Sequence, residues 1–220
     1  MVAGNTFGPA KKTTISAIKV LTSSGSGTNA GVIAGVNWAT NDFLGHSKKP
    51  SLANMSLGGG KSQALDDAVV ASIGKGLSYA IAAGNSNTDA CTSSPANVKP
   101  AVTVGSTTLE DESSVEVDER SSFSNYGTCV DIFSPGSLIP GAWMTSDTAI
   151  KTISGTSMAS PIVAGVMALV LGDDPAITPA QMHELIKNQA TKGVIDLVCG
   201  SSTVCAKSPN LLVYSRTVAK

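Results

Sequence analysis

Ser157 stands between small residues and an apolar run, in the stretch ISGTSMASPIVAG. The run after it predicts a helix over residues 158–171, so the serine lies where a strand meets a helix. Backbone N–H groups in the first turn of a helix are unpaired and carry partial positive charge. A serine there could act as a nucleophile and have its oxyanion stabilised by these groups. The alternative is that Ser157 only caps the helix, a common role for serine.

Asn85 is a second polar residue at a position suited to chemistry, because it directly follows the apolar segment AIAAG. Residues 77–85 predict a buried strand, and α/β proteins place their sites at the carboxyl ends of parallel strands. A side-chain amide there can donate a hydrogen bond to negative charge that develops during a reaction. The alternative is an asparagine that only makes a turn.

Predicted strands and helices alternate along the chain, and they must position these two side chains. The alternation predicts an α/β fold in which a mostly parallel sheet lies between helices on both faces. No internal repeat or linker interrupts residues 1–220, so we expect a single domain. Strands are expected at residues 13–21, 51–57, 77–85, 101–107 and 129–136, and helices at residues 28–43, 62–76, 158–171 and 178–190.

Composition excludes several classes of protein. The chain has 220 residues, of which 42% are hydrophobic and only 14% are charged, which indicates a globular protein rather than a disordered one. A net charge of −1 provides no electrostatic footprint for nucleic acid or for an anionic membrane. No uninterrupted apolar run reaches the ~18 residues that a membrane helix needs. We therefore expect neither nucleic acid nor a membrane as a partner.

Six acidic residues crowd the stretch between residues 110 and 119. Dense like charge repels itself unless a cation is bound, so this stretch is predicted to be a solvated loop, with a cation site as the alternative. The six residues are Glu110, Asp111, Glu112, Glu116, Asp118 and Glu119.

The four cysteines form no CxxC pair and have too few histidines nearby for a zinc site. Two disulfides are expected, in any of three pairings, which implies an oxidising compartment. Buried free thiols are the alternative. The cysteines are Cys91, Cys129, Cys199 and Cys205.

Several motifs resemble one family in both sequence and order. GTSMASPIVAG resembles the serine motif of the subtilisin-like serine proteases, AIAAGN their oxyanion-asparagine motif, and SLGGG a substrate-binding wall. SSFSNYGTCVDIFSPG, ISGTSMASP and NLLVY resemble the proteinase K branch in particular. The resemblance covers nearly the whole chain, from Gly8 to Tyr214. It implies a three-layer subtilisin-like fold and a secreted serine endopeptidase that acts on protein or peptide substrates.

The resemblance assigns roles to particular residues. Ser157 would form the acyl-enzyme, and Asn85 with the Ser157 backbone N–H would form the oxyanion hole. No cofactor is expected for this chemistry. The primary specificity pocket would be flanked by Ser56, Leu57, Gly58 and Gly59 and closed at its base by Ala82, Ala83 and Gly84. Gly25, Ser26 and Gly27 would offer a backbone edge to which an extended peptide adds as a strand.

The same resemblance implies a structural calcium site and a disulfide pairing. The calcium ligands would be the backbone carbonyls of Pro100 and Val102 and the carboxylate of Asp131, since this hard cation prefers oxygen. Cys91 would pair with Cys129, as in some members of the branch. Cys199 and Cys205 would then close a short loop.

The catalytic base and its orienting acid are missing from the pattern. A Ser-His-Asp enzyme needs both, and the family carries them before the serine, in an H-G-T-H and a D-[ST]-G context. His46 and His183 match neither context, and we expect each to be a surface residue. The family histidine that follows the proline of the serine motif, which is not the base, is replaced here by Ile162.

The segment after Met1 resembles the one that follows the family's histidine motif, so the missing part would directly precede it. That part also contributes strands to the sheet, and without them we expect unpaired strand edges and exposed apolar surface. The isolated chain is therefore expected to be inactive and either unstable or completed by a missing N-terminal segment or a propeptide. A peptide-binding or inhibitory fragment without catalysis is the alternative function.

Overall fold

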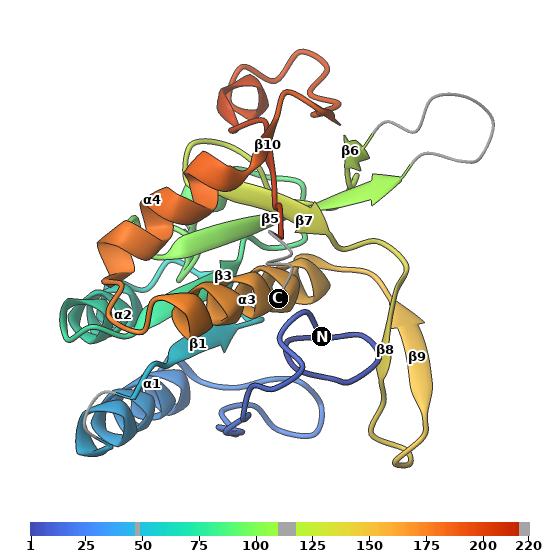
Figure 1. Cartoon of the computed structure of the whole chain (residues 1–220). Coiled ribbons are helices and arrows are strands. Elements are labelled where there is room, and N and C mark those ends of the chain that lie inside the picture. The colour runs from blue at the N-terminus through green and yellow to red at the C-terminus, as the bar shows by residue number, and fades with distance from the viewer. Residues whose placement is uncertain (47–48, 110–117, 216–220) are drawn as a thin grey trace.

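The computed structural model describes residues 1–46, 49–109 and 118–215 (Figure 1). Most of the acidic stretch, residues 110–117, lies outside the described residues, so the choice between a solvated loop and a cation site stays a prediction.

The main sheet is mostly parallel, as predicted. Its strands follow the order β1-β3-β5-β7-β12-β10, and every neighbouring pair from β1 to β12 runs parallel, while β10 is antiparallel to β12. The strands are β1 (Leu52–Met55), β3 (Ser78–Ala82), β5 (Val102–Leu109), β7 (Ile132–Pro135), β10 (Thr191–Lys192) and β12 (Leu211–Leu212).

Helices cover both faces of this sheet, so the three-layer α/β prediction is confirmed (Figure 1). Successive residues of β3 separate the two faces: Ala80 packs in the cluster with α3 and α4, whereas Tyr79 and Ile81 pack with α1 and α2. This alternation follows from the two-residue period of a strand. The helices are α1 (Asn29–Gly45), α2 (Gln63–Gly74), α3 (Thr156–Asp173) and α4 (Pro179–Gln189).

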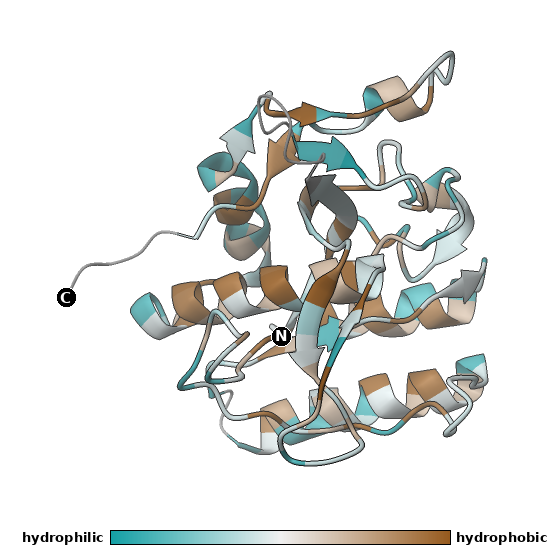
Figure 2. Ribbon diagram, turned by 90° about the vertical axis from the view of Figure 1, so that its right-hand side faces the viewer, coloured by the Kyte–Doolittle hydropathy of each residue, from teal (hydrophilic) through white to brown (hydrophobic). Residues whose placement is uncertain are grey.

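Helix α3 crosses the middle of the molecule, where its turns are largely apolar (Figure 2). Within the described residues it is the one helix long and apolar enough to cross a membrane. Much of it is buried against the sheet, which is typical of the core helix of a globular protein.

Side-chain caps begin two of the predicted helices. Thr28 accepts a hydrogen bond from Gly31 N–H at the start of α1. Thr178 and Gln181 form a reciprocal capping box at the start of α4, with Pro179 in the first turn. Helix α3 is different: Gly155 is its N-cap, and Ser157 already lies inside the helix. The interpretation of Ser157 as a capping residue is therefore wrong.

Shorter elements complete the fold. An antiparallel pair, β8 and β9, projects beside the N-terminal segment (Figure 1). Strand β6 pairs with β5 and β11, and β2 pairs with β4. The bounds are β2 (Gly59–Gly60), β4 (Ser93–Ser94), β6 (Asp118–Arg120), β8 (Ile139–Ala142), β9 (Ile150–Ile153) and β11 (Ile195–Asp196), with 3₁₀ turns at Ala90–Thr92 and Cys205–Lys207.

The predicted strand at residues 13–21 is wrong. These residues form no strand, and most of their side chains are exposed. The β-branched run has the composition of a strand, but a strand forms only beside a partner that accepts its backbone hydrogen bonds. Among the described residues, β1 pairs with β3 alone, so its other edge is open and does not reach residues 13–21.

An apolar groove separates this segment from the open edge of β1. The groove has a volume of about 350 Å³ and lies between residues 18–21, α1 and β1. The unpaired edge of β1 therefore faces an apolar groove, with no partner strand among the described residues. The apolar side chains of the groove include Ile18, Val20, Leu21, Val32, Val36 and Met55.

Both disulfides implied by the family resemblance are present. Cys91 is bonded to Cys129, and Cys199 is bonded to Cys205. No described cysteine is free, so the alternative of buried thiols is wrong.

Candidate active site

Ser157 lies in the first turn of α3, at the carboxyl side of the sheet. Its hydroxyl donates to the backbone carbonyl of Ser56 at 3.3 Å, and the Ser56 hydroxyl donates to the Ser157 carbonyl at 2.9 Å. Ser56 follows β1, so these two bonds fix the start of α3 against the end of that strand. No described residue accepts a hydrogen bond from the Ser157 backbone N–H, which leaves this donor available to a ligand.

Asn85 is held next to Ser157 by Thr156. Its Oδ1 accepts from the Thr156 N–H at 2.8 Å and from the Thr156 hydroxyl at 2.9 Å. The NH₂ group of an amide cannot accept a hydrogen bond, so these bonds determine which end of the amide is Oδ1. The Nδ2 donor is thereby directed away from Thr156. Asn85 Nδ2 and Ser157 N–H together can stabilise an oxyanion.

A buried amide, Asn125, shapes the loop that carries Asn85. Asn125 Oδ1 accepts from the backbone N–H groups of Ser86 at 3.0 Å and Thr88 at 3.1 Å, while its Nδ2 donates to the Ala83 carbonyl at 2.8 Å. Gly84 takes a φ of +105°, which favours glycine. A Cβ at Gly84 would also overlap the Asn125 amide, so glycine is required there.

Arg120 ties the same loop to the C-terminal part of the chain. Its Nη1 donates to Asn87 Oδ1 at 3.0 Å and to the Ser124 carbonyl at 2.7 Å, and its Nε donates to the Leu197 carbonyl at 2.8 Å. The guanidinium also lies 5.2 Å from the ring centre of Tyr126. Burial lowers the pKa of the Arg120 guanidinium from its ordinary value. These contacts compensate the cost of burying the charge.

The residues predicted to flank the specificity pocket lie on two neighbouring strand ends. Ser56 contacts Ser157 directly, and Gly59 pairs with Ser94 in the β2–β4 ladder. Ala82 and Ala83 are buried at the end of β3, directly before the Asn85 loop. The remaining predicted members, Leu57, Gly58 and Gly84, lie in the same two segments.

The residues predicted to form a peptide-binding edge lie in a separate turn. Thr22 donates through its backbone N–H and its hydroxyl to the Ser26 carbonyl, and Gly25 N–H donates to Thr22. Gly27 directly follows this turn and packs against Leu21. All three predicted residues are exposed, but no described hydrogen bond joins them to the Ser157 site. Their role in binding stays a prediction.

Neither histidine lies at the nucleophile. His46 caps the end of α1, where Nδ1 lies 2.9 Å from the Asp42 carbonyl. His183 lies on α4, with Nε2 at 3.1 Å from Asp131 Oδ1. Only 14% of the His183 side chain is exposed, so the expectation of a surface residue is wrong for His183 and confirmed for His46.

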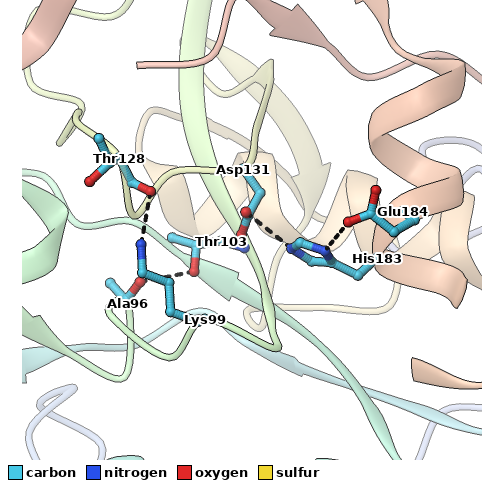
Figure 3. Close-up of polar contacts among 7 residues, drawn as sticks. All are labelled: Ala96, Lys99, Thr103, Thr128, Asp131, His183 and Glu184. Atoms are coloured by element: carbon cyan, nitrogen blue, oxygen red, sulfur yellow. Dashed lines mark hydrogen bonds and ion pairs between the residues drawn. The ribbon is translucent and has the colours of Figure 1, made fainter. Parts of the chain in front are cut away.

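The calcium site predicted at Pro100, Val102 and Asp131 stays a prediction, and the surroundings of Asp131 do not favour a cation. Asp131 Oδ2 accepts from the Thr103 N–H at 2.9 Å, and Oδ1 faces His183, so both carboxylate oxygens have partners (Figure 3). Two lysines, Lys187 and Lys207, line the adjoining hollow of about 220 Å³. Calcium takes about 6–8 oxygen ligands and favours negative surroundings. Among the described residues no three His, Cys, Asp or Glu side chains gather as a metal cluster.

Three contributors to this site have no role in the sequence analysis. Thr156 orients Asn85, Asn125 shapes its loop, and Arg120 anchors that loop. Their partners are 71, 39 and 33 residues away along the chain, so no local pattern could have identified them. One available signal is that Thr156 and Asn125 lie inside motifs that carry the family resemblance.

Comparison with known proteins points to one family. The model of the subtilase family matches residues 1–203. A crystal structure of a cold-adapted subtilisin-like serine proteinase superposes with a TM-score of 0.85 at 46% sequence identity, covering 98% of this chain and 71% of that chain.

Two curated proteins are similar over nearly the whole chain. Alkaline serine exoprotease A of Vibrio alginolyticus is 49% identical over 218 residues, which make up 99% of this chain and 37% of that protein. Extracellular serine proteinase of Thermus sp. (strain Rt41A) is 47% identical over 214 residues, or 97% of this chain and 48% of that protein. The chain thus spans less than half the length of these curated relatives.

Proposed function

Because this chain belongs to the subtilase family, we propose that it carries the nucleophile and the oxyanion hole of a serine endopeptidase. In the assembled enzyme Ser157 Oγ attacks the carbonyl carbon of a peptide bond, and a histidine base takes its proton. The resulting acyl-enzyme is then hydrolysed by water.

The observation that carries this proposal is the pair of hydrogen bonds by which Thr156, the residue before Ser157, holds the Asn85 amide. Thr156 holds Asn85 Oδ1, which leaves Asn85 Nδ2 and the unpaired Ser157 N–H to receive the developing oxyanion. Donors fixed before the reaction need no reorganisation during it, and loss of one such donor typically lowers kcat by about 10²–10³-fold.

The base must come from outside the described residues. The Ser157 hydroxyl donates to a backbone carbonyl, and both histidines are engaged elsewhere. A serine hydroxyl is a weak nucleophile without a base. Loss of the histidine in subtilisin, a member of this family, lowers kcat by about 10⁶-fold. We therefore expect the chain alone to be inactive, and its partner to be a segment that contributes the base, or a propeptide.

Protein or peptide substrates and an extracellular location follow from the relatives. The Thermus relative is named an extracellular proteinase, and two disulfides suit an oxidising compartment. The small residues at the pocket, from Gly58 and Gly59 to Ala82 and Ala83, suit a broad range of side chains at the scissile bond.

A fluorophosphonate serine probe tests the proposal. The folded chain is incubated with the probe, and its intact mass is measured beside a Ser157→Ala variant. We expect no adduct on the chain alone. A polypeptide from a relative that carries the histidine and aspartate motifs is then added, and one adduct should form that the variant lacks. Failure to form this adduct in a sample shown to contain the bound partner would overturn the proposal.

A second candidate function is binding of an extended peptide without catalysis. The apolar groove between residues 18–21 and the open edge of β1 favours it, because an added strand could pair with that edge. Fluorescence anisotropy of a labelled apolar peptide tests this candidate. Saturable binding that Ile18→Asp weakens supports it, and no binding to a folded sample excludes it.

A further inference from the structure

The side chains around Asp131 form a polar cluster that the proposed catalytic function does not use (Figure 3). Asp131 directly precedes β7, and His183 reaches it from α4. Only 15% of the Asp131 side chain is exposed, similar to the figure for His183. The two residues therefore meet where little water can reach them.

The carboxylate is fixed from the sheet side. Asp131 N–H donates to the Thr103 carbonyl, and Thr103 N–H donates back to Asp131 Oδ2, each at 2.9 Å. The Thr103 hydroxyl donates to the Ala96 carbonyl at 2.9 Å, and this bond holds the loop before β5 against that strand. This leaves Oδ1 as the carboxylate oxygen that needs a partner.

That partner is the imidazole of His183. Nε2 lies 3.1 Å from Asp131 Oδ1, and Nδ1 lies 3.5 Å from Glu184 Oε1, so each ring nitrogen faces a carboxylate. Nε2 is shielded from solvent, and its contact with Asp131 Oδ1 does not meet the geometry of a hydrogen bond. No other described side chain is a partner of Nε2, so its contact with Asp131 has no competitor among the described residues.

The charges nearby oppose a metal ion. Lys187 lies one helical turn after His183 and lines the hollow beside Asp131 together with Lys207. Lys99 reaches the same corner and donates to the Thr128 carbonyl at 3.2 Å (Figure 3). A calcium ion in this hollow would meet the Asp131 carboxylate, both of whose oxygens already have partners, beside Lys187 and Lys207.

We propose that His183 takes the place of a metal ion at Asp131, so that α4 is clamped to β5 and β7 without calcium. The neighbouring residues Met182 and Ile186 are buried in the core, which fixes the helix that carries the imidazole. The clamp joins segments 52 residues apart along the chain, from Asp131 to His183.

Calcium addition to the folded chain gives the first test. Thermal unfolding is followed by circular dichroism in 10 mM calcium and in excess chelator, for the natural chain and for Asp131→Asn. A specific calcium ion present at about 100 times its Kd would raise Tm by roughly 5–10 °C. We expect the calcium response of the two proteins to be the same. A response that Asp131→Asn abolishes would overturn the proposal.

Substitution of His183 gives the second test, with His46 as the matched control. His183→Ser should lower Tm by about 3–6 °C, and His183→Gln, which keeps a donor, should lower it by less. His46→Ser, at an exposed helix end, should change Tm by less than about 2 °C. Equal effects at the two histidines would overturn the proposal. If His183→Ser does not fold, the calcium test still decides.

Discussion

The two sides of β1 differ in whether other described segments form hydrogen bonds there. Toward β3, the chain forms a bonded site in which Ser56, Asn85, Thr156 and Ser157 contact one another over long sequence separations. Toward residues 13–21, the edge of β1 is open, and an apolar groove replaces a partner strand. The Ser157 side is thus held by hydrogen bonds among the described residues, whereas the edge of β1 at the groove has no partner strand among them.

This contrast separates two requirements of catalysis. The proposed oxyanion hole depends on a backbone donor and on an amide that Thr156 holds in place. Activation of the hydroxyl depends on a base, and that base has no place among the described residues. We infer that the two halves of a serine-protease site can be separated, with the nucleophile half keeping its shape.

Substitution of Asn125 should have the largest effect on the free energy of unfolding. Asn125→Ala removes the amide that bonds Ala83, Ser86 and Thr88, and it should lower the free energy of unfolding by about 3 kcal/mol. Urea denaturation measures this quantity. Asn41→Ala is the control, because Asn41 is exposed on α1. An equal loss in the control would show that the Asn85 loop does not depend on Asn125.

Thr156 should give the next largest effect. Thr156→Val keeps the shape of the side chain but removes the hydroxyl that donates to Asn85 and accepts from Gly84 N–H at 3.1 Å. We expect a loss of about 1.5 kcal/mol in the free energy of unfolding, because a donor and an acceptor lose their partner. Thr156→Ser, which retains the hydroxyl, should be clearly more stable in the same urea titration. Equal stability of the two variants would contradict this account.

Tyr79 lines the groove, and its buried phenol should make the free energy of unfolding depend on pH. Burial raises the pKa of Tyr79, although a hydrogen bond with Ser72 acts in the opposite direction. The folded state therefore retains the phenol proton where the unfolded chain loses it. This contribution to stability is complete below the ordinary pKa of tyrosine, about 10, and is lost as pH rises through the folded pKa.

Tyr79→Phe should lower the free energy of unfolding by about 1 kcal/mol at neutral pH. Above about pH 10 its stability should fall less steeply than that of the natural chain. Urea unfolding at several pH values measures both differences. Parallel pH profiles for the two proteins would rule out a role for this phenol.

Ile18 should give the smallest effect. Its side chain is 38% exposed at the groove, so Ile18→Ser should change the free energy of unfolding by less than about 0.5 kcal/mol. Val104→Ala, in a fully buried and paired strand, should lower it by about 2 kcal/mol. A large effect of Ile18→Ser in thermal unfolding would mean that the groove is already closed in solution.

The sequence predicts the parts of the fold that depend on local chemistry. The helices that begin near Thr28 and Thr178 and the buried strands β3 and β5 are confirmed, because hydrophobic periodicity acts over a few residues. The positions of Ser157 and Asn85 at neighbouring element ends also follow from local patterns. Which cysteines pair follows only from the family resemblance.

Features that depend on distant partners could not be predicted locally. Residues 13–21 have the composition of a strand but lack a neighbour, so pairing overrides propensity. The bonds of Asn125 and the contact of His183 with Asp131 join segments that only the folded chain brings together. The single-domain prediction and the roles of Gly25, Ser26 and Gly27 stay predictions.

The hydrogen bonds that build the nucleophile site also bear on the order of folding. The Asn85–Thr156 bond closes a loop of 71 residues, and the Ser56–Ser157 bonds span 101 residues. Closing such loops costs chain entropy before any contact repays it, so these bonds form only once β1, β3 and α3 are already assembled. A chain that is still folding accordingly has no preorganised oxyanion hole. The placement of Asn85 against Thr156 is therefore expected to come late in folding.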